Sequence, residues 1–405
     1  MKYTPLKNLY YQNPEKWESI YSRRFDAPHT RHFPVNIRQY NHPSSYPAFL
    51  CYTEEMAMLL QSIYKKQMVL MPVLRDAPSV MLSQFTQACL LEEIQSTNEI
   101  EGVRSTKSQI RAVMTRDRRI SDSLHLRSVV DKYKKILSAE QIDFSDCASL
   151  SRFYRHFVLD EVVSENEGSR PDGKLFRKEP VDIQSAVQKT IHRGLWPESE
   201  IISAMDSALA ILHEEEKTPA LVRIAVFHYL FGYIHPFYDG NGRTGRFIAS
   251  YYLAREFNRI IAVKLSSLIN KNKGPYYEIF QSTNNEYNRG DLTPFVLWFM
   301  KIVEQSFSET IAVLERKIQQ LQNYSVRLDS LPLGDALTRE LYFILLQASL
   351  FEGEGATMKD LTDTTEKTYV TVKNRLREMP PDHLWIISDR KPFRYKLNIR
   401  QVFYR

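Results

Sequence analysis

The sequence has few cysteines and no long apolar run, and each absence excludes a class of protein. The three cysteines, Cys51, Cys89 and Cys147, lie far apart without metal-like spacing, which fits small buried side chains in a reducing cytoplasm. No run of about 18 apolar residues appears, and the N-terminus lacks the apolar core of a signal peptide. Neither a membrane span nor secretion is indicated. We also find no internal repeat, so a cytoplasmic globular protein is expected.

Length and charge indicate more than one domain. A chain of 405 residues exceeds one compact core of ordinary size, and 43% hydrophobic with 12% aromatic residues is typical of globular proteins. The net charge is +6, and residues 365–405 alone carry ten Lys or Arg against four Asp or Glu. The rest of the chain is therefore near neutral. A basic C-terminal part favours a module that faces nucleic acid.

Residues 235–246 read HPFYDGNGRTGR and combine a proton acceptor, a carboxylate, three glycines and two arginines. Glycine permits positive φ and close backbone approach, so the N–H groups of residues 240–242 are able to point at an anion. The apolar residues 247–255 predict a helix directly afterwards, which places the anion at a helix N-terminus. This composition indicates a polyphosphate site.

The charged residues of this stretch fit the same ligand. Arg243 and Arg246 lie one helical turn apart and are able to grip two successive phosphates. Asp239 would repel a bare phosphate unless Mg²⁺ lay between them. The imidazole of His235 suits a general base that takes a proton from a hydroxyl. Each piece alone is usually structural, but their joint occurrence at this spacing favours a site.

The stretch resembles the Fic family signature, His-x-Phe-x-(Asp/Glu)-(Gly/Ala)-Asn-Gly-Arg-x-x-Arg, with every fixed position filled. In the Doc branch, which resembles kinases, a lysine replaces the glycine found here at Gly242, so this chain favours nucleotidyl transfer. The resemblance implies transfer of AMP from ATP to a hydroxyl of a target protein. It also implies a role for each residue of the site, as follows: His235 is the base, Asp239 holds Mg²⁺, Gly240, Asn241 and Gly242 bind the α-phosphate, and Arg243 and Arg246 bind the β- and γ-phosphates.

A second motif lies upstream. Ser79 is a plausible cap for a helix that runs into STNEIEG at residues 96–102. Thr97 and Glu101 share one helix face, and Gly102 is able to end the helix. This resembles the Fic inhibitory motif, (Ser/Thr)-x-x-x-Glu-(Gly/Asn), which implies that Glu101 pairs with Arg246 in place of the γ-phosphate. An exposed helix end is the alternative.

Two further segments are predicted around the motif. Residues 175–183 alternate near their end, as a short two-stranded flap would, and Fic proteins dock the target's extended segment on such a hairpin. Val181 and Ile183 would share one strand face there, although a plain surface hairpin is the alternative. Tyr276 or Tyr277 would stack on an adenine ring or pack in the core.

The last 70 residues have the pattern of a winged helix. We predict helices over 337–350, 357–361 and 365–379, then wing strands around residues 389–392. A recognition helix would present Lys373 and Arg377, and the wing tip would present Arg390 and Lys391. DNA contact and protein contact are about equally expected, because charge alone supplies only non-specific affinity.

The sequence therefore predicts a mainly α-helical protein in four parts. These are residues 1–107 with the inhibitory helix, a Fic core at 108–305, a connecting helix and linker at 306–334, and a winged helix at 335–405. Residues 1 to about 50 are expected to be irregular, and 53–66 helical. Thr218 at the N-cap and Pro219 at N1 are expected to begin a helix over 220–234, which is apolar nearly all round and would deliver His235 from a buried support. The predicted function is a protein adenylyltransferase restrained by Glu101.

Two alternatives stay open at this stage. The same site would serve an enzyme that removes AMP, with Glu101 positioning water, or the chain is a DNA-binding regulator with a silent Fic fold. ATP and Mg²⁺ are the expected co-substrate and cofactor, and a target protein, DNA and a second copy of the chain are the partners considered.

Overall fold

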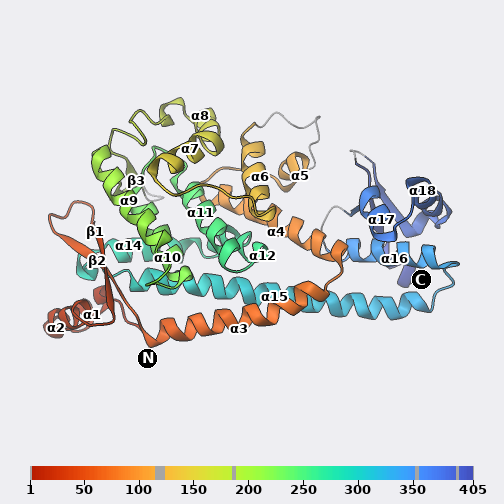
Figure 1. The fold of residues 1–405 in the computed structure, drawn as a ribbon, viewed down its shortest axis with the longest axis horizontal. Coiled ribbons are helices and arrows are strands. Elements are labelled where there is room, and N and C mark those ends of the chain that lie inside the picture. Colours follow the sequence, from red (N-terminus) through yellow and green to blue (C-terminus); the bar gives the residue numbers. More distant parts are fainter. Residues whose placement is uncertain (1, 115–123, 185–187, 352–354, 389–391, 405) are drawn as a thin grey trace. The chain divides into compact units, whose positions relative to one another are not determined.

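The computed structural model describes residues 2–114, 124–184, 188–351, 355–388 and 392–404, and it is mostly helical (Figure 1). The described chain forms two compact units. The first comprises residues 1–65, 93–106 and 122–306, and the second comprises 66–92, 107–121 and 307–405. Three long helices contain residues of both units: α3 (Glu54–Asp76), α4 (Ser79–Ile100) and α15 (Thr293–Asp329). No helix among the described ranges is long and apolar enough to cross a membrane.

Helices α10 (Ala220–Ile234) and α11 (Asn241–Glu256) form the core of the first unit, and α10 packs against α11 and α9 (Glu198–His213). Residues 224–231 of α10 are all buried, as the nearly continuous apolar sequence predicted. Each large apolar side chain buried here contributes about 1.5–3 kcal/mol. The short loop between α10 and α11 is therefore held between two rigid supports.

The remaining elements of the first unit surround this pair. They are α6 (Leu124–Leu137), α7 (Cys147–Phe157), α8 (Leu159–Glu165), the 3-10 turn Glu167–Ser169, α12 (Arg259–Ala262), α13 (Leu265–Lys271), α14 (Lys273–Asn284) and the 3-10 turn Glu286–Asn288. An antiparallel hairpin of β3 (Asp182–Gln184) and β4 (Thr190–Arg193) pairs Ile183 with His192. We refer to it as the flap hairpin.

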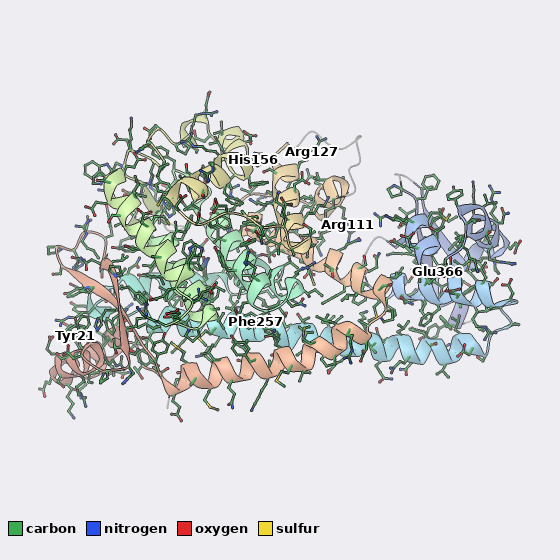
Figure 2. All side chains as sticks on the ribbon, viewed as in Figure 1. Tyr21, Arg111, Arg127, His156, Phe257 and Glu366 are labelled. Carbon is green, nitrogen blue, oxygen red and sulfur yellow. The ribbon has the colours of Figure 1, made fainter. Side chains whose placement is uncertain are left out.

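The N-terminal 50 residues are regular, so the expectation of irregular structure was wrong. They form α1 (Leu6–Gln12), α2 (Pro14–Phe25) and an antiparallel pair, β1 (Thr30–Arg38) with β2 (Ser45–Cys51). Phe33, Val35 and Ile37 are buried on one face of β1, and the proline between the first two obscured this alternation. Tyr21, labelled in Figure 2, has its ring 5.5 Å from Phe25 in an aromatic cluster.

Two local expectations around the long helices also need revision. Helix α3 continues to Asp76 through Pro72, ten residues beyond the predicted stretch. The cap of α10 is Pro219 without a side-chain hydrogen bond, so the predicted cap by Thr218 was wrong. By contrast, α4 spans Ser79–Ile100 as expected.

The second unit contains, besides parts of the long helices, α5 (Lys107–Met114) and a C-terminal group of elements. That group comprises α16 (Ala336–Ser349), β5 (Ala356–Thr357), α17 (Met358–Thr365), α18 (Tyr369–Glu378), the 3-10 turn Pro381–His383, β6 (Leu384–Ile387), β7 (Arg394–Leu397) and α19 (Ile399–Phe403). The strands form one antiparallel sheet in the order β5-β7-β6. Three helices followed by a strand pair agree with the predicted elements of this region.

Candidate active site

His235 lies at the C-terminus of α10, where the backbone turns into the left-handed region with φ 54° and ψ 62°. Its Nδ1 lies 3.3 Å from the carbonyl oxygen of Gly232. Because a carbonyl only accepts, this contact assigns the proton to Nδ1 and leaves Nε2 as the basic nitrogen. Burial and the neighbouring His192 and Arg177 lower the pKa of His235, while Glu101 opposes them. The imidazole is therefore held neutral, as a general base requires.

The loop after His235 is closed by the side chain of Asn241. Its Oδ1 accepts from the Phe237 N–H at 2.9 Å, and its Nδ2 donates to the Phe237 carbonyl at 2.8 Å. Gly240 begins the turn into α11 with φ 73°, a conformation that favours glycine. A Cβ there would also collide with Val158. The amide side chain of Asn241 is thus engaged by the loop itself, and the N–H of Gly240 donates to Asp239 at 2.5 Å.

Arg243 is buried at 1% exposure in a second group of charges. Its Nη1 lies 2.6 Å from Glu161 Oε1, and its Nη2 lies 3.5 Å from Asp239 Oδ1. Lys132, also buried, places its Nζ 3.7 Å from the other oxygen of Glu161. Two cations thus share one buried carboxylate behind the loop, next to the N-terminus of α11. The N–H groups at this helix N-terminus favour an anionic ligand.

Arg246 contacts both residues of the upstream motif. Its Nε donates to Thr97 Oγ1 at 3.1 Å, and its Nη2 donates to the Thr97 carbonyl at 3.0 Å. The same Nη2 lies 2.8 Å from Glu101 Oε1. Helix α4 ends at Ile100, so Glu101 lies in the turn that follows, where Gly102 has φ 79°. The structure therefore brings together Thr97, Glu101 and Arg246, although 149 positions separate the first from the last.

These groups face one cavity of about 600 Å³. Its wall includes Glu101, His235, Gly242 and Arg246 from the two motifs, Ile183 from the flap hairpin, and the aromatic pair Tyr276 and Tyr277. A Cβ on Gly242 would overlap the carboxylate of Glu101 and lie 2.9 Å from Arg246 Nη1. Glycine at this position therefore leaves room for a group bound against Arg246.

The two tyrosines of the cavity differ in what they contact. Tyr276 is buried and its hydroxyl lies 3.0 Å from Nε2 of His228, while Tyr277 is 38% exposed and donates to the carbonyl of Ile100 at 3.2 Å. Tyr277 thus links α14 to the C-terminal end of α4.

Val181, the other residue predicted on the flap hairpin, precedes β3, and its carbonyl accepts from the N–H of Gly194.

The predicted DNA-contacting residues lie in the second unit. Lys373 and Arg377 are on α18, and the Nζ of Lys373 lies 5.4 Å from the ring centre of Tyr369. Arg390 and Lys391 lie outside the described residues. Lys373 and Arg377 are not among the residues that line the cavity.

Sequence reasoning missed four charged or titratable residues around the site: Lys132, Glu161, Arg177 and His192. Each is buried, and each contacts the loop or the residues beside it. Charged residues are rarely buried without partners. Their partners come from helices and strands distant in sequence, so no local spacing pointed to them.

The fold and the site together define a class of protein. It is mainly helical, and it has a glycine-rich loop beside a histidine, at a helix N-terminus suited to binding an anion. Residues 156–253 match the model of the Fic/DOC family. Over these residues the chain resembles the Fic family.

Named relatives and a solved structure are also similar to this chain. Over 117 residues the chain is 30% identical to Protein adenylyltransferase Fic of Nematostella vectensis, which covers 29% of this chain and 22% of that protein. It is 24% identical over 235 residues to Protein adenylyltransferase fic-1 of Caenorhabditis briggsae, covering 55% and 41%. The chain thus spans less than half the length of these relatives. The crystal structure of a Fic family protein from Desulfovibrio desulfuricans shares the fold, with a TM-score of 0.53 at 20% identity over 85% of this chain and 96% of that one.

Proposed function

We propose that this chain is a protein adenylyltransferase, which moves AMP from ATP to the hydroxyl of a Ser, Thr or Tyr side chain on a target protein. The observation that carries the proposal is the single cavity shared by His235, Gly242, Arg246 and Glu101. A base, an anion-binding helix N-terminus and a buried guanidinium in one cavity are the parts that transfer from a triphosphate needs. The names of the relatives support the same reaction class.

In the proposed reaction each of these groups has one role. Nε2 of His235 takes the proton of the target hydroxyl, whose oxygen bonds to the α-phosphorus of ATP. The bond from that phosphorus to the β-phosphate oxygen breaks, and pyrophosphate leaves. Backbone N–H groups at the start of α11 stabilise the charge that grows on the α-phosphate. Arg243 is proposed to hold the β-phosphate and Arg246 the γ-phosphate.

Asp239 is the residue that would hold Mg²⁺ against the phosphates. Its side chain is 38% exposed, and its surroundings contain no group of three or more His, Cys, Asp or Glu within the described chain. A cation bound by one carboxylate, phosphate oxygens and water fits this arrangement, because Mg²⁺ keeps several waters. When bound, the ion neutralises charge on the phosphates.

We also propose that Glu101 restrains the reaction. Its carboxylate occupies the side of Arg246 at which the γ-phosphate would bind, and the pairing lowers the pKa of Glu101 against the opposing effect of burial, which is the larger single influence. The carboxylate therefore stays charged and competes with phosphate for one guanidinium. Release requires Glu101 to leave Arg246.

Glu101→Gly tests the function and the restraint together. We expect ATP- and Mg²⁺-dependent labelling of protein to rise in Glu101→Gly and to vanish in the double variant with His235→Ala, measured as an added AMP by intact mass. Glu101→Gln should raise labelling as well, and Glu99→Gln is its matched control, because it removes the same charge at the same end of α4 and keeps an oxygen that accepts from Asn270. Equal labelling in wild type and Glu101→Gly would refute the restraint.

The reverse reaction is distinguished with an AMP-modified protein as substrate. Removal of AMP by wild type, lost in Glu101→Gly, would replace transfer with hydrolysis as the function of this cavity. Under our proposal the wild type leaves the modification in place.

For the C-terminal group of elements we propose a winged helix that binds DNA through Lys373 and Arg377. Both lie on α18, and residues 365–405, which include α18, carry ten Lys or Arg against four Asp or Glu. A gel shift that weakens with salt and is lost in Lys373→Ala with Arg377→Ala supports this. An unchanged shift in that double variant refutes it. We also propose a cytoplasmic location, with which the three buried free cysteines are consistent. Finally, we propose that the chain forms a homodimer, which sedimentation tests.

A further inference from the structure

Arg177 is fully buried, and no carboxylate lies within ion-pair distance of it in the described part of the chain. Its guanidinium instead donates to three backbone carbonyls. Nε donates to His235 O at 2.9 Å, Nη1 to Glu179 O at 2.7 Å and Nη2 to Leu195 O at 2.9 Å. Burial lowers the pKa of Arg177 to about 10, so the group remains charged at neutral pH. A buried charge with only carbonyl partners is costly, which marks this contact as specific.

The three carbonyls belong to two structural features. Glu179 lies three residues before β3 and Leu195 two residues after β4, so these two residues are the stems of the flap hairpin. The third carbonyl is that of His235, the proposed base. One side chain thus fastens both stems of the hairpin to the backbone of the base. A lysine would not replace it, because its ammonium lacks the planar fork.

Neighbouring backbone contacts strengthen the same connection. Ile234 O accepts from Leu195 N at 3.0 Å, and Pro236 O accepts from Arg177 N at 3.3 Å. Three successive carbonyls at the end of α10 are therefore bound by the hairpin stems and Arg177. Helix C-termini leave such carbonyls without partners, and the left-handed conformation of His235 is unfavourable for a non-glycine residue. These donors hold that conformation in place.

Gly194 shows how closely the parts fit. A Cβ at this position would collide with the guanidinium of Arg177 and lie 2.9 Å from the Cβ of His235. Gly194 is thus required by the close approach of the hairpin stem to both residues.

From these contacts we propose that Arg177 is a positioning residue: it ties the flap hairpin to His235, so that a target strand docked on the hairpin meets a correctly oriented base. The proposal rests on the proposed function and adds how target docking and proton transfer are joined. Ile183 on the hairpin and His235 face the same cavity, which places the docked chain beside the base.

Arg177→Lys in the Glu101→Gly background tests the proposal. We expect kcat for labelling of the target to fall about a hundredfold, since small misplacement of a reacting group has such effects. The ATP affinity should stay within about twofold, because the phosphate-binding arginines are untouched. Arg193→Lys is the control, as Arg193 lies on the same hairpin in an exposed pair with Asp182, and labelling should change less than about twofold. Unchanged kcat, or kcat and ATP affinity falling together, overturns the proposal.

A second variant and a readout without activity separate this proposal from the function it rests on. Gly194→Ala keeps Arg177 but displaces its guanidinium, and it should lower kcat in the same way. In either variant the amide of Leu195 should exchange faster with solvent, and the NMR signals of the His235 ring should shift. If Glu101→Gly itself labels nothing, the proposed function fails while these measurements still test the connection. If neither the amide exchange of Leu195 nor the NMR signals of the His235 ring change, the proposed connection is overturned.

Discussion

Thr97 gives Arg246 two acceptors, its hydroxyl and its carbonyl, and both come from α4, whose end directly precedes Glu101. We predict that Thr97→Val will destabilise the protein by about 1–3 kcal/mol, because the buried Nε–H of Arg246 loses its acceptor. It should also raise labelling above wild type, since Arg246 is then held less firmly toward Glu101. Urea unfolding and intact mass measure the two effects.

Thr97→Ser is the matched control for this change because it keeps the hydroxyl. It should retain wild-type restraint with only a small loss of stability. If valine and serine behaved alike, the hydroxyl would have no part in holding Arg246.

Asn241 offers a test of loop closure. Asn241→Asp keeps the acceptor for Phe237 N–H but replaces the Nδ2 donor with a carboxylate oxygen facing the Phe237 carbonyl. We predict a loss of about 1–3 kcal/mol in the free energy of unfolding. Asn258→Asp is the control, because Asn258 caps α12 through its oxygen only and aspartate serves there equally. Equal losses of unfolding free energy at both positions would contradict a special role of the Asn241 side chain in closing the loop.

How far the sequence predicts the site depends on whether its residues are neighbours in the chain. The loop at 235–246 could be read from residue types and spacing, because all its groups lie within one turn and one helix start. The contact of Glu101 with Arg246 was expected only from family resemblance. Arg177, Glu161 and Lys132 could not be found, since burial of a charge depends on tertiary contacts that no local pattern encodes.

At the scale of elements, the C-terminal end of α4 is held by α13 and α14. Lys273 Nζ donates to Glu99 O at 3.0 Å, Tyr277 donates to Ile100 O, and Asn270 Nδ2 donates to Glu99 Oε2 at 2.8 Å. Two of these contacts satisfy carbonyls that the last turn of a helix leaves open. They therefore hold the turn that carries Glu101.

Tyr277→Phe removes one of these hydrogen bonds while keeping the ring. A hydrogen bond is worth about 1 kcal/mol, so release of Glu101 should become about fivefold more frequent and basal labelling should rise equally. In the Glu101→Gly background the same substitution should change nothing, because no carboxylate is left to release. An equal increase in both backgrounds would show that Tyr277 acts on the nucleotide instead.

Elements were predictable where periodicity was long and uninterrupted. The apolar run of α10 and the stripe of α4 gave the correct helices, because burial of one face needs such spacing. The hairpin of β1 and β2 was missed, since Pro34 and the many tyrosines and histidines around it hid a short alternation. Pairing with β2 and packing on α2 decide that structure, and both are tertiary.

For the whole molecule, buried neutral histidines make stability depend on pH. Burial lowers the pKa of His228 to about 3 and that of His192 to about 4, below the ordinary value near 6.5. As the pH falls below about 6.5 the unfolded chain takes up protons that the folded chain does not, so stability is lost. Each imidazole contributes up to about 1.4 kcal/mol per pH unit between about 5.5 and 4.5.

The buried carboxyl of Glu93 has the opposite effect on the pH dependence of stability. Burial raises its pKa to about 7, so the folded state binds this proton first and gains stability as the pH falls toward about 4.5. His228, His192 and His235, whose pKa is also lowered to about 3, outweigh this carboxyl and leave a net loss of stability in acid. We therefore predict a lower urea midpoint at pH 5 than at pH 7.5, with a smaller difference in His228→Gln. A difference unchanged by that variant would contradict the assignment to His228.

Because Thr97 lies within α4 and Glu101 in the turn just beyond its end at Ile100, separating Glu101 from Arg246 does not require α4 to unwind. Only this turn has to move, while Thr97 keeps its contacts with Arg246. Arg246 therefore stays positioned for a phosphate when Glu101 is released. Small changes at the C-terminal end of α4 would set how often that release occurs.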